Sequence, residues 1–372
     1  MPVEQIAPAV PSATTTFASA RTLLAKAVED RAFPGAAFGV FHAGQTVVVD
    51  AVGRFTYERN SPAVEPQTVF DLASVSKVVA TTAAAMILNS RGQLDLDSRL
   101  GDVLPGFVIG MEHGSGKERV TLRMLLAHNS GLPAYVRFFE ACATPDTLLR
   151  SALQLPLEVP PATRTEYSDP GFILLGKAIE ILTGETLDTF CAREVFAPLG
   201  LMSTGYNPPP SMRAAIPPTE NDQSFRHRVV QGEVQDENAF ILGGIAGHAG
   251  VFSNVSDLLR FAECIVEGGK TSEDRNLFTP ATLDLFATPQ PTSSGRPRAL
   301  GWDVPTAPSS SGQYFGPRSI GHLGYAGTSL WIDRDRALAV VLLTNRTWPD
   351  RSNDAIRQIR PAFHDAVVES LR

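Results

Sequence analysis

The chain has 372 residues with a formal net charge of −7, and 43% of its residues are hydrophobic. This length and composition allow a sizeable core in one or two domains, and the acidic balance argues against a nucleic-acid partner. The cysteines Cys142, Cys191 and Cys264 are widely spaced and fit neither a disulfide framework nor a metal site. We therefore predict buried free thiols, no metal and no other cofactor.

The start of the chain has no basic segment followed by a long apolar run, and no stretch reaches the length of a membrane-spanning helix. We expect a cytoplasmic protein without a membrane partner. Removal of a signal peptide would instead imply a periplasmic or secreted protein. No pattern in the sequence specifies the oligomeric state.

Residues 1–15 are rich in proline, alanine and threonine, which predicts a flexible N-terminal arm. Apolar residues at helical spacing predict a helix over residues 17–30. Two apolar runs, residues 35–42 and 46–52, are separated by Ala43-Gly44-Gln45. This pattern predicts a β-hairpin near the N-terminus.

The next segment contains an unusual lysine. Eleven uncharged residues follow Lys77, apolar on every side, which predicts a helix that is buried all round. A buried ammonium is costly unless it is paired or loses its proton, and a lysine that loses its proton can act as a base. Ser74 lies one turn earlier, and none of the other four lysines has a serine three residues before it. This predicts a serine nucleophile with a lysine base; the alternative is a lysine that reaches the surface beside a capping serine.

The middle of the chain is helical and interrupted by prolines. Tyr135 follows the break Gly131-Leu132-Pro133, and Tyr167 precedes a predicted helix, so each can face a cleft or simply pack. Residues 207–236 are polar and proline-rich, and we expect an irregular segment that lines the site. Helices are predicted over residues 120–128, 144–153, 172–183, 187–196, 257–267 and 280–287.

Glycines surround His322 in residues 321–327, which marks either a turn or a close backbone approach by a ligand or another element. A strand edge there would offer N–H groups to an oxyanion. His128 or His248 could complete a serine triad, but no Gly-x-Ser-x-Gly motif occurs in the sequence. The chain is predicted to end with strands over residues 328–332 and 337–344 and a helix over residues 354–371, interrupted at Pro361.

Strands at both ends with helices between them predict an α+β fold. We expect an antiparallel sheet built from both chain ends, flanked by helices, with a mostly helical domain inserted. The sheet domain would comprise residues 16–70 and 235–372, and the helical domain residues 71–234. The active site would lie between the two domains.

Three motifs in this order resemble the serine β-lactamase and penicillin-binding-protein family. Ser74-Val75-Ser76-Lys77 matches the family's Ser-x-x-Lys, and Tyr167-Ser168-Asp169 matches its Tyr-x-Asn with aspartate in the last place. His322-Leu323-Gly324 matches its Lys/His-Thr-Gly element. The resemblance is closest to class C β-lactamases, D-Ala-D-Ala carboxypeptidases and β-lactamase-like carboxylesterases. Residues 125–133 and 342–346 are also similar to the family.

The resemblance implies the β-lactamase/transpeptidase fold and a role for each motif. Ser74 would attack an ester or amide carbonyl, while Lys77 and Tyr167 would share the proton transfer. The N–H groups of Ser74 and Tyr325 would form the oxyanion hole. The residues expected to bind substrate are Asp169, His322, Leu323, Gly324 and Tyr135.

Two departures from the family pattern bear on the substrate. Asp169 replaces an amide that normally donates a hydrogen bond to substrate, and its carboxylate would hold Lys77 charged and shift base duty toward Tyr167. Leu323 replaces a threonine whose hydroxyl helps to hold a substrate carboxylate, and leucine can neither donate nor accept a hydrogen bond. Both changes favour an uncharged ester over β-lactams and D-Ala-D-Ala peptides. We expect His322 to hold an anion only when it is protonated, as the pH falls toward about 6.

We therefore predict a serine hydrolase that acts by an acyl-enzyme on a small ester or amide, in the first place a carboxylesterase on short-chain esters. The alternatives are a D-Ala-D-Ala carboxypeptidase or D-aminopeptidase, and a weak class C-like β-lactamase. A non-catalytic binding module of the same fold is a further alternative. The intact set of Ser74, Lys77 and Tyr167 argues against that module.

Overall fold

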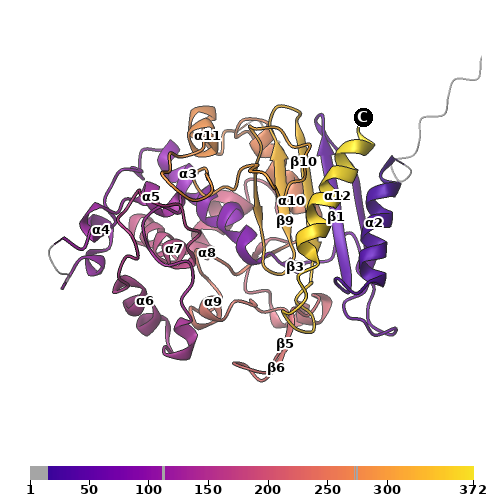
Figure 1. Ribbon diagram of the computed structural model, residues 1–372, viewed down its shortest axis with the longest axis horizontal. Helices are drawn as coiled ribbons and strands as arrows, with labels where there is room; N and C mark the ends of the chain where they lie inside the picture. Colours follow the sequence, from indigo (N-terminus) through magenta and orange to yellow (C-terminus); the bar gives the residue numbers. More distant parts are fainter. Residues whose placement is uncertain (1–15, 111–113, 272, 274) are drawn as a thin grey trace, which may run out of the picture.

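The computed structural model describes residues 16–110, 114–271, 273 and 275–372. The predicted arm of residues 1–15 lies outside the described residues. Figure 1 shows the large sheet and two terminal helices on one side of the molecule and a group of shorter helices on the other. In the described part of the chain, no helix is both long and apolar enough to cross a membrane.

Five antiparallel strands form the main sheet. They are β1 (Gly35–His42), β2 (Gln45–Gly53), β8 (Ile320–Leu323), β9 (Ser329–Asp333) and β10 (Leu338–Thr344). Their order in the sheet is β2-β1-β10-β9-β8. Strand β1 pairs with β10 from Ala36 opposite Thr344 to His42 opposite Leu338. The prediction of an antiparallel sheet built from both chain ends is therefore confirmed.

Helices cover both faces of this sheet, which explains why β1 and β10 are buried along nearly their whole length. Helices α2 (Ala18–Glu29) and α12 (Ile356–Ser370) pack against each other and against one face. Helix α10 (Val255–Val266) packs against β1, β9 and β10 on the inner side, toward the helical part of the molecule.

Helix α12 runs through Pro361 without a break, so the predicted interruption is wrong. A proline inside a helix costs about 3 kcal/mol, because it removes a hydrogen bond and crowds the preceding turn. Phe363 and Val367, just after the proline, are fully buried against the sheet. Burying each such side chain contributes about 1.5–3 kcal/mol, enough to offset the proline.

The helical part contains the buried segment predicted after Lys77. Every residue from 78 to 88 is buried, which confirms a helix without a solvent face. Its first turns are a 3-10 helix (Ala73–Val75) and a π-helix (Lys77–Thr82), and α3 (Ala83–Ser90) continues them. The remaining α-helices are α4 (Leu100–Val103), α5 (Leu122–Leu126), α6 (Pro145–Leu153), α7 (Asp169–Thr183), α8 (Leu187–Cys191), α9 (Glu237–Ile241) and α11 (Pro280–Ala287). The three cysteines are buried free thiols, as predicted.

Short strands join the nucleophile turn to the rest of the molecule. Strand β3 (Phe70–Asp71) pairs with β7 (Val251–Ser253), which also pairs with β4 (Gly205–Tyr206). The segment over residues 207–236 is largely irregular, as predicted, apart from a 3-10 helix (Pro210–Ala215) and the hairpin of β5 (Glu220–Asp222) and β6 (Arg228–Val230). Its last residues, Gln235 and Asp236, reach the cavity that contains Ser74.

Candidate active site

The turn that carries Ser74 is fixed by a buried carboxylate. Asp71 accepts hydrogen bonds from the N–H of Ala73 at 2.8 Å and from the N–H of Gln235 at 2.7 Å. Burial raises the pKa of Asp71 to about 6, although these two N–H groups oppose the rise. Ala73 has a φ of +47°, in the left-handed region that non-glycine residues rarely adopt. Strain of this kind persists only where the surroundings hold it, here directly before Ser74.

Lys77 is fully buried and surrounded by oxygen atoms. Its Nζ donates to Ser74 Oγ at 3.0 Å and to the carbonyl oxygen of His248 at 2.9 Å. Asp169 Oδ1 lies 2.7 Å from the same nitrogen. Burial by itself lowers the pKa of Lys77, but Asp169 and Tyr167 outweigh it and hold that pKa above its ordinary value. Lys77 is therefore an ammonium at neutral pH.

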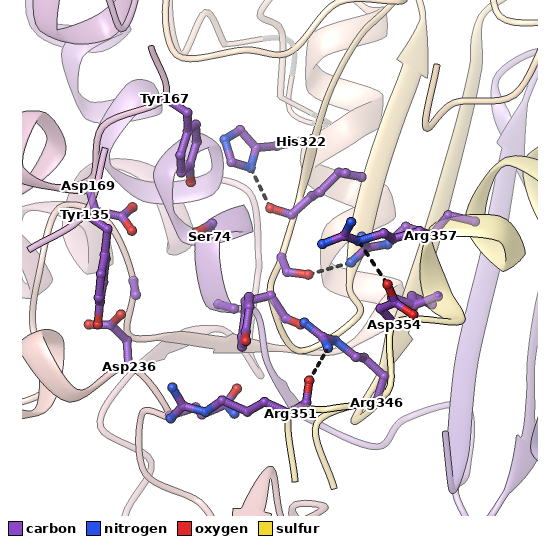
Figure 2. Close-up of a pocket in the computed structure, with 18 of the residues that line it drawn as sticks. Ser74, Tyr135, Tyr167, Asp169, Asp236, His322, Arg346, Arg351, Asp354 and Arg357 are labelled. Carbon is purple, nitrogen blue, oxygen red and sulfur yellow. Dashed lines mark hydrogen bonds and ion pairs between the residues drawn. The ribbon is translucent and has the colours of Figure 1, made fainter. Parts of the chain in front are cut away.

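Tyr167 lies two residues before α7, and the centre of its ring is 4.8 Å from Lys77 Nζ. Figure 2 shows its hydroxyl directed toward Ser74. Ser168 caps α7 by accepting from the N–H of Gly171 at 3.1 Å, and its own N–H donates to His128 Nδ1 at 2.9 Å. Burial and Asp169 raise the pKa of Tyr167, while Lys77 opposes the rise, so the phenol is neutral at pH 7.

The end of β8 approaches the nucleophile turn closely. A Cβ at Gly324 would lie 2.4 Å from the carbonyl oxygen of Leu72, so only glycine fits there. In the described part of the chain, neither the N–H of Ser74 nor that of Tyr325 has a hydrogen-bond acceptor. Free N–H groups beside a nucleophile are the donors that an oxyanion requires.

His322 does not behave as the sequence suggested. Its ring is buried, and Nδ1 lies 2.8 Å from the carbonyl oxygen of Leu323, to which it can donate as a neutral imidazole. Burial, together with the charges of Arg298 and Lys77, holds the pKa of His322 well below its ordinary range. The expectation that His322 holds an anion near pH 6 is therefore wrong, because the ring stays neutral at that pH.

The predicted site residues meet at one cavity of about 860 Å³. Lys77 is fully buried and reaches the cavity only through its hydrogen bond to Ser74 Oγ. Tyr135 contributes a partly exposed ring to the wall. Neither His128 nor His248 hydrogen-bonds Ser74 among the described residues. The ring of His128 is tilted against Tyr167, with ring centres 4.6 Å apart, and the ring of His248 pairs with Asp236 at 2.8 Å. The predicted residues on the wall are Ser74, Tyr135, Tyr167, Asp169, His322, Leu323, Gly324 and Tyr325.

Charged residues that the motifs do not include also line this cavity. Each acid on the wall lies beside a basic side chain: Asp169 by Lys77, Asp236 by the imidazole of His248, Glu237 by Arg351, Asp303 by Arg298 and Asp354 by Arg357. Arg346 and Arg360 are 7% and 6% exposed, and within the described ranges neither pairs with an acid. Their guanidinium groups donate to backbone carbonyls instead. The wall therefore carries two cations, Arg346 and Arg360, that no acid in the described part of the chain neutralises.

These arginines were missed by the sequence analysis. Arg346 falls within residues 342–346, which are similar to the family, but that similarity does not assign a function to the arginine. Arg360 lies on α12, and an arginine on a helix is ordinarily solvated. Among the described residues, no group of three or more histidines, cysteines or acids is placed to hold a metal ion.

Comparison with known proteins agrees with the geometry. The family model named Beta-lactamase matches residues 20–362. The chain belongs to the β-lactamase family. It is 34% identical over 351 residues to a Bacillus subtilis (strain 168) protein named N-acetylmuramyl-L-alanine amidase, covering 84% of this chain and 77% of that protein. It is 31% identical over 309 residues to an Escherichia coli (strain K12) protein named "Putative D-alanyl-D-alanine carboxypeptidase", covering 75% and 69%.

The fold of this β-lactamase-family chain is shared by solved structures. One, titled "EstCE1, a hydrolase with promiscuous acyltransferase activity", has a TM-score of 0.75 at 22% identity, covering 95% of this chain and 99% of that chain. A penicillin-binding-protein homologue from Caulobacter crescentus has a TM-score of 0.74 at 20% identity, covering 95% and 97%. The predicted family and α+β fold class are thus confirmed, and the family is one of serine hydrolases.

Replacing Asp169 with asparagine is expected to move the rising limb of the kcat/KM profile, on which the Lys77/Tyr167 pair loses a proton, to lower pH. Asp169 is the principal group that raises the pKa of Lys77 against burial, and it also raises the pKa of Tyr167. Without the carboxylate both pKa values fall, so whichever group must lose a proton does so at lower pH. The profile is measured with a neutral ester between about pH 6 and pH 10.

Asp303→Asn is the matched control for this experiment. Asp303 lies on the same cavity wall, but it is not among the groups that shift the pKa of Lys77 or Tyr167. Its variant should keep the wild-type limb. An Asp169→Asn profile that coincides with wild type would contradict the role of Asp169 in setting these pKa values.

Proposed function

We propose that the protein hydrolyses ester or amide bonds through an acyl-enzyme on Ser74. The observation that carries the proposal is the place of Ser74 Oγ. It lies 3.0 Å from the Nζ of a fully buried lysine and beside two N–H groups that find no acceptor among the described residues. A serine hydroxyl needs a neighbouring group to take its proton, and the oxyanion needs fixed donors. The described residues around Ser74 supply both.

The reactive form of the enzyme is the one in which the Lys77/Tyr167 pair has released one proton to solvent, a fraction that grows with pH because both pKa values are raised. In the first step, Ser74 Oγ attacks the carbonyl carbon and its proton passes to this deprotonated pair. The pair then gives a proton to the leaving alcohol or amine, which leaves an ester on Ser74. In the second step, water attacks this ester, the pair takes the proton of the water, and Ser74 recovers its own as the acid departs. Since the two groups are coupled, we assign proton transfer to the pair and not to either member.

The charge on the cavity wall supports a substrate that carries a carboxylate. Leu323 provides no hydroxyl at the end of β8, which by itself favours an uncharged ester. Arg346 and Arg360, however, place two cations elsewhere on the wall, and neither pairs with an acid among the residues that the structure describes. Buried cations are best compensated by an anion. The relatives named as an amidase and a carboxypeptidase also support an amide bond. Our first candidate is therefore an amide or ester of a carboxylate-bearing, peptide-like molecule.

The second candidate is a carboxylesterase on short, neutral esters, as the sequence analysis expected. Leu323 lines the cavity, and the partly exposed rings of Tyr135 and Tyr325 add apolar surface to it. A short ester needs only the nucleophile, the proton-transfer pair and the oxyanion donors. This activity is expected even if the natural substrate is larger.

Two matched pairs of esters separate the candidates. In one pair, p-nitrophenyl butyrate is compared with mono-p-nitrophenyl succinate, which places a carboxylate on the acyl side. In the other, phenyl acetate is compared with 3-acetoxybenzoate, which places it on the leaving group. In at least one of the two pairs, we expect the anionic ester to have a higher kcat/KM than its neutral partner, by about one to two decades. The reason is that a hydrogen bond to a charged group contributes about 1.5–3 kcal/mol.

Arg346→Gln is expected to reduce the preference for the anionic ester, because it removes a cavity-wall cation that pairs with no acid in the described ranges. Nitrocefin and a D-Ala-D-Ala peptide, assayed alongside, test the β-lactamase and carboxypeptidase alternatives. If wild-type enzyme prefers the neutral ester in both pairs, the carboxylate-bearing substrate is ruled out and the short-chain carboxylesterase takes its place.

A further inference from the structure

One peptide group links the proposed oxyanion hole to the C-terminal helix. The N–H of Tyr325 has no acceptor among the described residues, and the carbonyl oxygen of the same peptide group belongs to Gly324. That oxygen accepts a hydrogen bond from Nη2 of Arg360, which lies 36 residues further along the chain on α12. It also accepts from the N–H of Gly327 at 3.0 Å.

Arg360 also hydrogen-bonds two other carbonyl groups of the loop over residues 324–328. Its guanidinium donates to the carbonyl oxygen of Thr328 at 2.8 Å and to that of Gly327 at 3.3 Å. The side chain is 6% exposed and pairs with no acid in the described part of the chain, so its charge acts on these carbonyls. Figure 2 shows the neighbouring Arg357 forming an ion pair with Asp354 instead.

The same contacts reach the other half of the hole. The carbonyl oxygen of Thr328, which Arg360 holds, also accepts from the N–H of Gly324 at 2.8 Å. Thr328 Oγ1 donates to the carbonyl oxygen of Leu72 at 2.8 Å, two residues before Ser74. The two segments that present the N–H groups of Ser74 and Tyr325 are thus joined through Thr328, and Arg360 supports that junction.

We propose that Arg360 is a positioning residue for the oxyanion hole. In a trans peptide group the C=O and N–H point in opposite directions, so a donor that holds the Gly324 oxygen from behind aims the N–H of Tyr325 into the cavity. A cation on the carbonyl oxygen also polarises the peptide group and makes its N–H a stronger donor. The inference rests on the proposed acyl-enzyme chemistry, and it assigns Arg360 a part in the rate of acylation as well as in the charge of the wall.

A neutral ester separates this role from anion binding. We expect Arg360→Gln to lower kcat for p-nitrophenyl butyrate by about tenfold, with little change in KM. This decrease is smaller than the decrease of about 10²–10³ that follows removal of an oxyanion-hole donor itself. Affinity for an uncharged alkylboronic acid, whose tetrahedral Ser74 adduct places an oxygen in the hole, should fall by a similar factor. The carbonyl stretch of the acyl-enzyme should move to higher wavenumber, because the oxygen is less polarised.

The matched control is Arg357→Gln. Arg357 lines the same cavity, and removal of its side chain deletes the same charge. Among the described residues, its guanidinium pairs with Asp354 and makes no hydrogen bond to residues 324–328. It should acylate at the wild-type rate. Arg360→Lys keeps the charge and at least one donor, so it should recover part of the lost kcat; it also carries the test if the glutamine variant does not fold.

Wild-type kcat, boronate affinity and carbonyl frequency in a folded Arg360→Gln protein would overturn the inference. So would equal losses in Arg357→Gln, since these would show a general effect of charge. A loss confined to anionic esters would leave Arg360 an anion-binding residue only. If wild-type protein forms no adduct on Ser74, the proposed function itself fails, a result distinct from each of these.

Discussion

Ser74→Ala protein is expected to fold normally and to lose about three to six orders of magnitude in kcat, as covalent hydrolases do without their nucleophile. Ser74 Oγ accepts a hydrogen bond from Lys77 Nζ. Without that oxygen, the cavity can still bind substrate, but no ester can form on residue 74. Intact-mass spectra after incubation with a fluorophosphonate should show one adduct on wild type and none on the variant.

Ser76 provides the matched control, because it lies two residues away on the same turn. It is fully buried, and its Oγ accepts from the N–H of Val251 at 3.0 Å. Ser76→Ala leaves that buried N–H unpaired, which should lower the free energy of unfolding by about 1–3 kcal/mol. Its kcat should stay near the wild-type value. An adduct on a residue other than Ser74 would remove the proposed mechanism, and no adduct on wild type would favour the binding module.

The parts of the fold that depend on local pattern were predictable from the sequence. The strand over residues 35–42 and the helix over residues 78–88 are both buried. Their apolar composition and the spacing of their apolar residues are enough to predict this. The path of α12 through Pro361 was not predictable in this way. It depends on the burial of Phe363 and Val367 against strands that are distant in sequence, and this tertiary burial offsets a local preference.

The residues of the site also differ in whether local sequence or tertiary packing determines their role. Ser74, Lys77 and Tyr167 belong to motifs whose order identifies the family. The structure places Ser74 and Tyr167 on the wall of one cavity, with Lys77 hydrogen-bonded to Ser74 and next to the ring of Tyr167. The neutral state of His322 follows from its burial beside cations contributed by other segments, which no motif records. Arg360 resembles any surface arginine in the sequence, and only the packing of α12 buries it behind the loop after β8.

Lys77→Arg protein is expected to remain folded and to lose about two to four orders of magnitude in kcat/KM, the usual contribution of general acid–base catalysis. Arginine keeps the positive charge beside Asp169 but cannot release a proton, so the Lys77/Tyr167 pair could no longer accept one through residue 77. The larger guanidinium also enters a fully packed site, at a cost of about 1–3 kcal/mol in stability. The rate of acylation is measured from the burst with a p-nitrophenyl ester.

Two further lysine variants show which property of Lys77 matters. Lys117 is the other fully buried lysine among the described residues, and its Nζ donates to the carbonyl oxygens of Leu153 and Leu155, away from the cavity. Lys117→Arg should therefore change the melting temperature and leave kcat near wild type. Lys77→Met keeps the approximate volume of the side chain but removes the charge. If Lys77 only supplied a cation, the methionine variant would be inactive and the arginine variant would approach wild type, whereas proton transfer through Lys77 requires that both lose activity.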